Sequence, residues 1–271
     1  MKHTRGSHSA GGFTLIELIT VLVILGIVSA IGSHFVVSVF RSYDHSQQVS
    51  KLTMKGRLAI EQIARQVRNA VPNSVRTSAA GECVEFLPTL AAGNYLGSVP
   101  DTLNAAPAVA SVSVAPVTLG SAGAAAHFVL GGLDAGEIYT TGTPAARVNV
   151  DPASVSVNPV SAVGFTASHR FIRNSTNERF FIASEPLRLC LIGTDLIEYS
   201  AYGLDSGALT AAAPSSASAN LLAQQVSSAG AAFSLANSTE NRNAVLTLSL
   251  SFTQQDLTIA MRQEVLIRNV P

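Results

Sequence analysis

The sequence lacks tryptophan and has few charged and few aromatic residues. Of its 271 residues, 13% are charged and 6% are aromatic, whereas 47% are hydrophobic. The formal net charge is zero, which argues against nucleic-acid binding because neutralising phosphates requires an excess of Lys and Arg. The length allows one sizeable domain with an anchor, or two small domains.

Signatures of catalysis and metal binding are missing as well. The sequence has no Gly-x-Ser-x-Gly, no phosphate-binding glycine loop and no His-Glu-x-x-His. The six histidines are dispersed and offer no ligand spacing. Asp134 and Glu137 stand beside glycines, but their spacing suits a solvated turn better than a calcium loop. We therefore expect no enzyme activity, no catalytic residue, no metal site and no cofactor.

Cysteine is also scarce, since only Cys83 and Cys190 are present. An exported domain would allow a disulfide between them, whereas a cytosolic one would keep two buried thiols. The choice therefore depends on where the domain resides.

The longest run of apolar residues lies near the start of the chain. Residues 1–12, MKHTRGSHSAGG, are polar and basic, and residues 13–40 carry Glu17 as their only formal charge. A helix of that length crosses a hydrocarbon core of about 30 Å. The basic flank predicts a cytoplasmic N-terminus and an outward-facing C-terminal domain. A secretory signal peptide fits poorly because the run is too long and no A-x-A-like site closes it. A plain membrane anchor fits better, but leaves Glu17 unexplained.

The helical pattern continues beyond the apolar run. In residues 41–70, apolar residues recur at three- and four-residue steps, and Pro72 suits a helix end just before it. We predict one helix over residues 13–70, apolar all round in 13–40 and amphipathic in 41–70. Residues 41–76 contain seven Lys/Arg and two acids, whereas residues from 77 onward contain eight Arg and fourteen acids. A basic stalk thus joins an acidic head.

The junction at Gly12 and Phe13 carries a family resemblance. A basic leader ending in glycine, then Phe-Thr-Leu-Ile-Glu-Leu (13–18) and an apolar helix, resembles the class III signal sequence of type IV prepilins and type II secretion pseudopilins. The resemblance implies that a prepilin peptidase cleaves between Gly12 and Phe13 and that the new amino group of Phe13 is methylated.

In the same family, Glu17 would be the fifth residue of the mature chain. Its carboxylate would pair with the terminal amino group of a neighbouring subunit and fix the register of assembly, because a carboxylate inside a helical bundle needs a positive partner. A Glu17 that snorkels toward the membrane interface is the alternative.

Residues 71–271 are predicted to form a β-rich head. Strands are expected at residues 83–88 and 127–130, as two strands around a turn in 169–184, as a hairpin in 187–203, and as a terminal hairpin at 245–252 and 257–269. Residues 104–126 and 207–232 are rich in Ala, Ser, Gly and Val, and much of both segments is expected to be surface loop. Some of each segment is allowed as strand or as a short helix, with Ala219–Val226 as the helix candidate.

This head resembles the larger minor pilins, namely PilW-like proteins, J-type minor pseudopilins and biogenesis proteins of the mannose-sensitive haemagglutinin (MSHA) pilus. The resemblance implies an α+β, pilin-like fold, with a helix whose apolar half protrudes and whose other half packs on the head. It also implies a subunit in the bacterial inner membrane with its head in the periplasm, and later in a pilus at the cell surface.

Expected partners are the prepilin peptidase, other minor and major pilins contacted through the N-terminal helix, and the inner-membrane assembly platform. In an oxidising periplasm, a Cys83–Cys190 disulfide is expected. We predict a minor pilin that helps to initiate or cap assembly. The alternatives are a J-type minor pseudopilin of a type II secretion system and the head of a tip adhesin.

Overall fold

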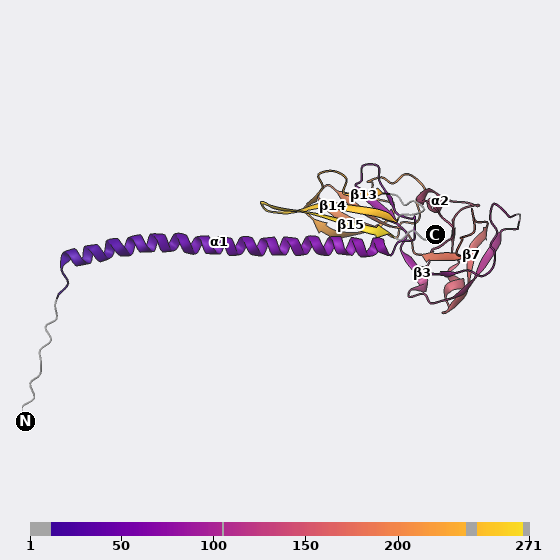
Figure 1. Ribbon diagram of the computed structural model, residues 1–271, viewed down its shortest axis with the longest axis horizontal. Coiled ribbons are helices and arrows are strands. Elements are labelled where there is room, and N and C mark those ends of the chain that lie inside the picture. The colour runs from indigo at the N-terminus through magenta and orange to yellow at the C-terminus, as the bar shows by residue number, and fades with distance from the viewer. Residues whose placement is uncertain (1–11, 105, 237–242, 268–271) are drawn as a thin grey trace, which may run out of the picture. The chain divides into compact units, whose positions relative to one another are not determined.

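The computed structural model describes residues 12–104, 106–236 and 243–267, so most of the expected leader lies outside the described residues. The chain divides into two compact units, residues 1–51 and residues 52–271. A single helix, α1 (Leu15–Arg68), begins in the first unit and ends in the second. Figure 1 shows this helix and labels several strands of the second unit.

Helix α1 changes character along its length. Between residues 15 and 40 its apolar side chains are exposed. From Leu52 onward every third or fourth residue is buried, which is the period of one helix face. The amides of Asn69 and Ala70 bond to carbonyls three residues earlier, and the helix stops before Pro72. The buried residues of α1 are Leu52, Gly56, Ala59, Ile60, Ile63, Ala64 and Val67.

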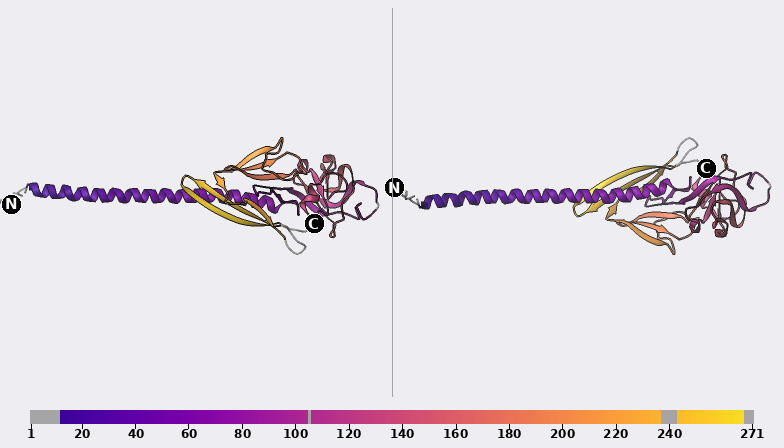
Figure 2. Two further views of the ribbon diagram at one scale, coloured as in Figure 1. Left: turned by 90° about the horizontal axis from the view of Figure 1, so that it is seen from above. Right: turned by 90° about the horizontal axis from the view of Figure 1, so that it is seen from below.

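Two antiparallel sheets cover this buried face. The first has the order β1-β2-β9-β10-β11, with strands at Arg76–Thr77, Cys83–Phe86, Leu187–Ile192, Asp195–Ser200 and Ser218–Gln224. The second contains β12 (Val226–Ser227), β13 (Phe233–Ala236), β14 (Ala244–Gln254) and β15 (Leu257–Ile267), and β14 pairs with the other three. In both views of Figure 2, the yellow hairpin β14–β15 of the second sheet and the orange strands β10 and β11 of the first sheet lie on opposite sides of the C-terminal part of α1.

The largest core lies between α1 and these sheets. In β14, buried and partly exposed residues alternate, so that Leu246, Leu248 and Leu250 share one face and join this core. Gly56 marks a close approach of helix and sheet. A Cβ atom built on Gly56 would lie 2.7 Å from Met261 Sδ and 2.9 Å from Phe252 Cδ2. The helix can lie this near the hairpin because residue 56 has no side chain.

A second group of strands builds another core in the same unit. A sheet of order β3-β8-β5-β6 has strands at Thr89–Asn94, Arg179–Ala183, His127–Val129 and Arg147–Asn149. A two-stranded sheet pairs β4 (Val109–Val117) with β7 (Val160–His169). The short helical elements are α2 (Ala135–Tyr139) and the 3₁₀ turns Ala122–Ala124 and Pro152–Val155.

Aromatic rings fill this second core. The Phe128 and Phe180 rings stack with centroids 5.1 Å apart, and Phe165 and Phe171 pack around Phe128 at 5.4 and 5.9 Å. Stacked and tilted aromatic pairs at these distances add to the free energy gained from burial alone.

The expected α+β, pilin-like fold class is confirmed, because a long N-terminal helix packs against several antiparallel sheets. The hairpins predicted in residues 187–203 and after residue 245 correspond to β9–β10 and β14–β15. Strict alternation predicted the strand at 245–252, and the turn near Gly193–Asp195 predicted the hairpin in 187–203.

The helix suggested for Ala219–Val226 is wrong, because these residues belong to strand β11, which pairs with β10, and to β12. Within residues 104–126, where some strand was allowed for, the nine-residue strand β4 pairs with β7. In β4, Val112 and Val114 alternate with serines, which is itself a strand pattern. In β11, pairing with β10 decides the conformation of residues with little strand preference of their own.

Because helix and hairpin lie so close at Gly56, a side chain added at this position should lower the stability of the fold. Replacing Gly56 with Leu should lower the free energy of unfolding by about 1–3 kcal/mol or more, because the hairpin side chains must move. Urea unfolding of the full chain in detergent, followed by far-ultraviolet circular dichroism, measures the change. Gly120→Leu is the control, since a Cβ at Gly120 meets no atom within 4 Å. Equal stability of the two variants would contradict the close approach.

Candidate functional site

The start of α1 contains the residues singled out by the sequence. Gly12 and Phe13 precede the helix and are exposed. The Thr14 carbonyl accepts the Leu18 amide at 3.2 Å, and the Thr14 hydroxyl accepts the Glu17 amide at 3.4 Å. Thr14 therefore caps the helix. The pattern Thr-x-x-Glu is that of a capping box, of which the structure forms the half made by the Thr14 hydroxyl.

Glu17 lies in the first turn of α1 with an exposed side chain. A carboxylate there interacts favourably with the positive end of the helix dipole. Within the described part of the chain, its carboxylate oxygens have no hydrogen-bond or ion-pair partner. Glu17 thus combines a local role in starting the helix with a carboxylate that is available to a group from outside the chain.

The surface of α1 from its start to Phe40 is mainly apolar. Large exposed hydrophobic residues occur from Phe13, which is 79% exposed, to Phe40, which is 69% exposed. By its length and composition, α1 is long and apolar enough to cross a membrane. Such a surface calls for lipid or for other apolar helices as its surroundings.

The two cysteines lie directly opposite each other on neighbouring strands. Cys83 on β2 pairs with Cys190 on β9, and the two form a disulfide in the structure. The Leu191 amide donates to the Glu82 carbonyl beside them. The cysteines therefore occupy a non-hydrogen-bonded pair, where facing side chains are closest.

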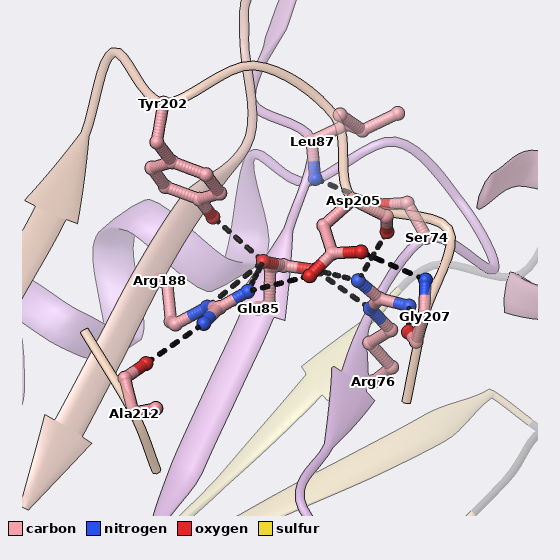
Figure 3. A network of polar contacts seen from close by, with 9 residues as sticks. All are labelled: Ser74, Arg76, Glu85, Leu87, Arg188, Tyr202, Asp205, Gly207 and Ala212. Atoms are coloured by element: carbon pink, nitrogen blue, oxygen red, sulfur yellow. Dashed lines mark hydrogen bonds and ion pairs between the residues drawn. The ribbon is translucent and has the colours of Figure 1, made fainter. Parts of the chain in front are cut away.

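Next to the disulfide, a buried carboxylate gathers two arginines. Glu85 on β2 is fully buried and lies opposite Arg188 on β9 and Arg76 on β1. Arg188 donates to Glu85 Oε1 from Nε and Nη2 at 3.0 and 2.9 Å, and Arg76 Nε donates to Oε2 at 2.6 Å. The Tyr202 hydroxyl adds a third bond to Oε1 at 2.7 Å. Figure 3 shows these groups converging on Glu85.

The same arginines tie down the loop that follows β10. Arg76 donates to the carbonyls of Asp205 and Gly207 at 2.7 and 2.8 Å, and Arg188 donates to that of Ala212 at 3.3 Å. Because each guanidinium bridges the carboxylate and loop carbonyls, the cluster is a structural clamp between the sheet and the loop. The clamp was not predicted from the sequence, although Glu85 and Arg188 are charges inside otherwise apolar strands.

Burial of this cluster changes how its tyrosines titrate. Burial, followed by the nearby charge and hydrogen bond of Glu85, raises the pKa of Tyr202 above its ordinary range. Burial, with Glu85 as the next contribution, likewise raises the pKa of Tyr139, whose ring lies 3.8 Å from the Arg76 guanidinium. Both phenols therefore stay protonated, and Tyr202 acts as a hydrogen-bond donor.

Asp134 and Glu137, which stand beside glycines in the sequence, are engaged within the fold. Asp134 caps α2 by accepting the Glu137 amide at 3.0 Å. Arg173 holds the Glu137 carboxylate through two bonds of 2.5 and 2.7 Å, and these bonds lower the pKa of Glu137. Across the described residues, no group of three His, Cys, Asp or Glu side chains is placed to hold a metal ion.

The comparisons with known proteins bear on the N-terminal segment. Residues 7–33 match the family model of the prokaryotic N-terminal methylation motif. No curated protein and no solved structure matches the chain. The matched residues include Gly12, Phe13 and Glu17, whereas the head is placed in no family by these findings.

Because Glu85 is buried between two arginines, the stability of the fold should depend strongly on its negative charge. Glu85→Gln should lower the free energy of unfolding by about 3–5 kcal/mol, because two buried guanidinium groups lose their counter-ion. Glu264→Gln is the matched control, since Glu264 pairs with Arg262 at 3.3 Å at the surface and should change stability by less than about 1 kcal/mol. Urea unfolding of the full chain in detergent compares the variants. Equal losses would contradict the clamp.

Proposed function

We propose that the chain is a minor pilin of an MSHA-type pilus. The premise is that residues 7–33 carry the N-terminal methylation motif of the type IV prepilin and pseudopilin superfamily. The observation that carries the proposal is the position of Glu17 within this motif, with a carboxylate that the described chain leaves unpaired. The proposal assigns a structural role, as members of this superfamily have, and no enzyme activity.

The first step is maturation of the N-terminus. Prepilin peptidase would cleave the peptide bond between Gly12 and Phe13 and methylate the amino group of Phe13. Support comes from the exposed, non-helical backbone at both residues, immediately before α1 begins. A protease needs an extended and accessible segment, which a helix interior does not offer.

The second step is entry into a filament. A carboxylate inside hydrocarbon is costly, by up to roughly 2.5–3.5 kcal/mol at a helix centre and by less near a helix end, so an unpaired Glu17 in the first turn favours a site that offers a cation. The methylated amino group of Phe13 on a neighbouring subunit would supply this cation within the helical bundle. Only one axial offset between two helices brings both groups together, so the ion pair sets the register.

The exposed apolar surface of residues 13–40 also supports a subunit that moves from the membrane into a filament. Before assembly, residues 13–40 would cross the inner membrane with the head in the periplasm. During assembly, the inner-membrane platform would transfer this segment from lipid to the bundle of other major and minor pilin helices. An apolar surface can make this exchange because both surroundings lack water.

The head supports a minor rather than a major subunit. Its four sheets, its separate aromatic core and the long segment that follows Cys190 make a head larger than is usual for a major pilin, and we infer from this size a minor subunit that starts or caps assembly. A J-type minor pseudopilin of a type II secretion system remains the second candidate, because the methylation motif is common to both groups.

Maturation gives the first test. Mass spectrometry of the protein from its native cell envelope should find a chain that begins at N-methylated Phe13. A Gly12→Leu variant should retain residues 1–12 and lack the methyl group, because the peptide bond after residue 12 is no longer recognised. A wild-type chain that keeps its leader would contradict the proposed function.

The role of Glu17 gives the second test. Glu17→Leu should be cleaved, methylated and retained in the membrane, because an added apolar side chain favours insertion. Its amount in sheared filaments should fall several-fold, because the neighbouring amino group loses its partner. Quantitative immunoblotting of membrane and filament fractions measures both.

Ser33→Leu is the matched control for Glu17→Leu, since it also replaces a polar residue of the same helix, where Ser33 bonds only to the Ala30 carbonyl. Wild-type levels of Glu17→Leu in filaments would overturn the role of Glu17 in register.

A further inference from the structure

Two long strands form open edges in the unit of residues 52–271. Strand β15 pairs only with β14, and β11 pairs only with β10, within the part of the chain that the structure describes. An open edge presents unpaired N–H and C=O groups, and proteins commonly protect such edges with charged side chains. The two strands differ in this protection.

Strand β15 is protected and β11 is not. On β15, the exposed side chains of Arg262 and Glu264 form an ion pair of 3.3 Å. Strand β11 has the sequence SANLLAQ, and the chain from residue 206 to residue 239 contains no charged residue. Its first four residues, Ser218–Leu221, are exposed on both faces of the strand.

The backbone of β11 is held in an extended conformation. Ser218–Leu221 keep a regular register with β10, and the register shifts only after Leu221. At the other end, Lys55 Nζ donates to the Gln224 carbonyl at 2.9 Å, which fastens the strand to α1. The free part of the edge is therefore Ser218–Leu221, where every second residue directs its backbone groups away from β10.

We propose that the β11 edge binds an extended, uncharged strand of a neighbouring pilin-type subunit, which adds to the five-stranded sheet. Backbone groups of an extended segment complete the unpaired ladder, as in other cases of strand addition. The absence of charge on β11 favours an uncharged occupant, because a charged side chain on the added strand would find no opposite charge across from it on β11. The inference rests on the proposed function for the presence of neighbouring subunits.

The geometry of a filament also restricts which strand is bound. Subunits whose N-terminal helices all run in one direction are related by a screw operation, so their contacts are heterologous and join two different surfaces. Strand β11 therefore faces a strand other than the β11 of its neighbour.

Photo-crosslinking of the full chain in its native cell envelope tests this contact. With Asn220→benzoylphenylalanine, illumination should join position 220 to an uncharged extended segment, other than residues 218–224, of a subunit with an N-methylated terminus. Mass spectrometry of the adduct identifies both the subunit and the segment. An adduct with β11 of a second copy, an adduct with a helix, or no adduct with such a subunit would overturn the proposal.

Matched variants separate the edge from general effects of charge. Adding Ala219→Lys to the crosslinking chain should lower the adduct yield several-fold, because a charge on the edge opposes pairing. Ala219→Thr should keep the yield, as should Ala260→Lys, which places the same charge on an exposed alanine of β15. An equal loss with both lysine variants, or no loss with Ala219→Lys, would overturn the proposal.

The same samples distinguish this inference from the proposed function. Methylation of Phe13 is read from each chain by mass spectrometry. A processed chain without the Asn220 adduct overturns the edge contact alone. A chain that keeps its leader overturns the proposed function, and the edge contact then fails with it, since no pilin-type neighbour would be present.

Discussion

Burial of one face of α1 by two sheets is the interaction on which the rest of the unit 52–271 depends. The face that includes Leu52, Ile63 and Val67 is completely buried, and both sheets contribute to the core that covers it. Each sheet alone would expose an apolar face to water, and so would the helix. Gly56 sets the distance between the helix and the hairpin β14–β15. Once they meet, β2 and β9 are fixed side by side, which in turn places Cys83 opposite Cys190 and Glu85 opposite Arg188.

The sequence predicted the elements whose patterns are local. A period of three to four residues marked the buried face of α1, and a period of two marked β14. It did not predict β11, where Ala, Ser and Asn have little strand preference and pairing with β10 decides the conformation. In β4, by contrast, the alternation of Val112 and Val114 with serines is a local strand pattern. Apart from the two hairpins and the expected disulfide, the pairing of distant strands was not predicted, as for β3 with β8 and β4 with β7.

The N-terminal residues and the buried cluster show the same contrast. Gly12, Phe13 and Glu17 could be singled out from the sequence because they form a motif within one short segment. The clamp around Glu85 brings together Arg76, Arg188 and Tyr202, which come from distant parts of the chain. A lone charge in an apolar strand signals that a partner exists. It does not identify that partner, because only the strand order decides which arginine lies opposite.

The disulfide has a mechanical consequence. The whole second group of strands, from β3 to β8, lies between Cys83 and Cys190 in sequence, inside the loop that the disulfide closes. A tensile force applied between α1 and the terminal hairpin would pass directly from residue 83 to residue 190 through the covalent bond. Residues 84–189 would carry no tension. The aromatic core around Phe128 is therefore shielded from load along the chain, and pulling on the helix strains only the core that α1 itself completes.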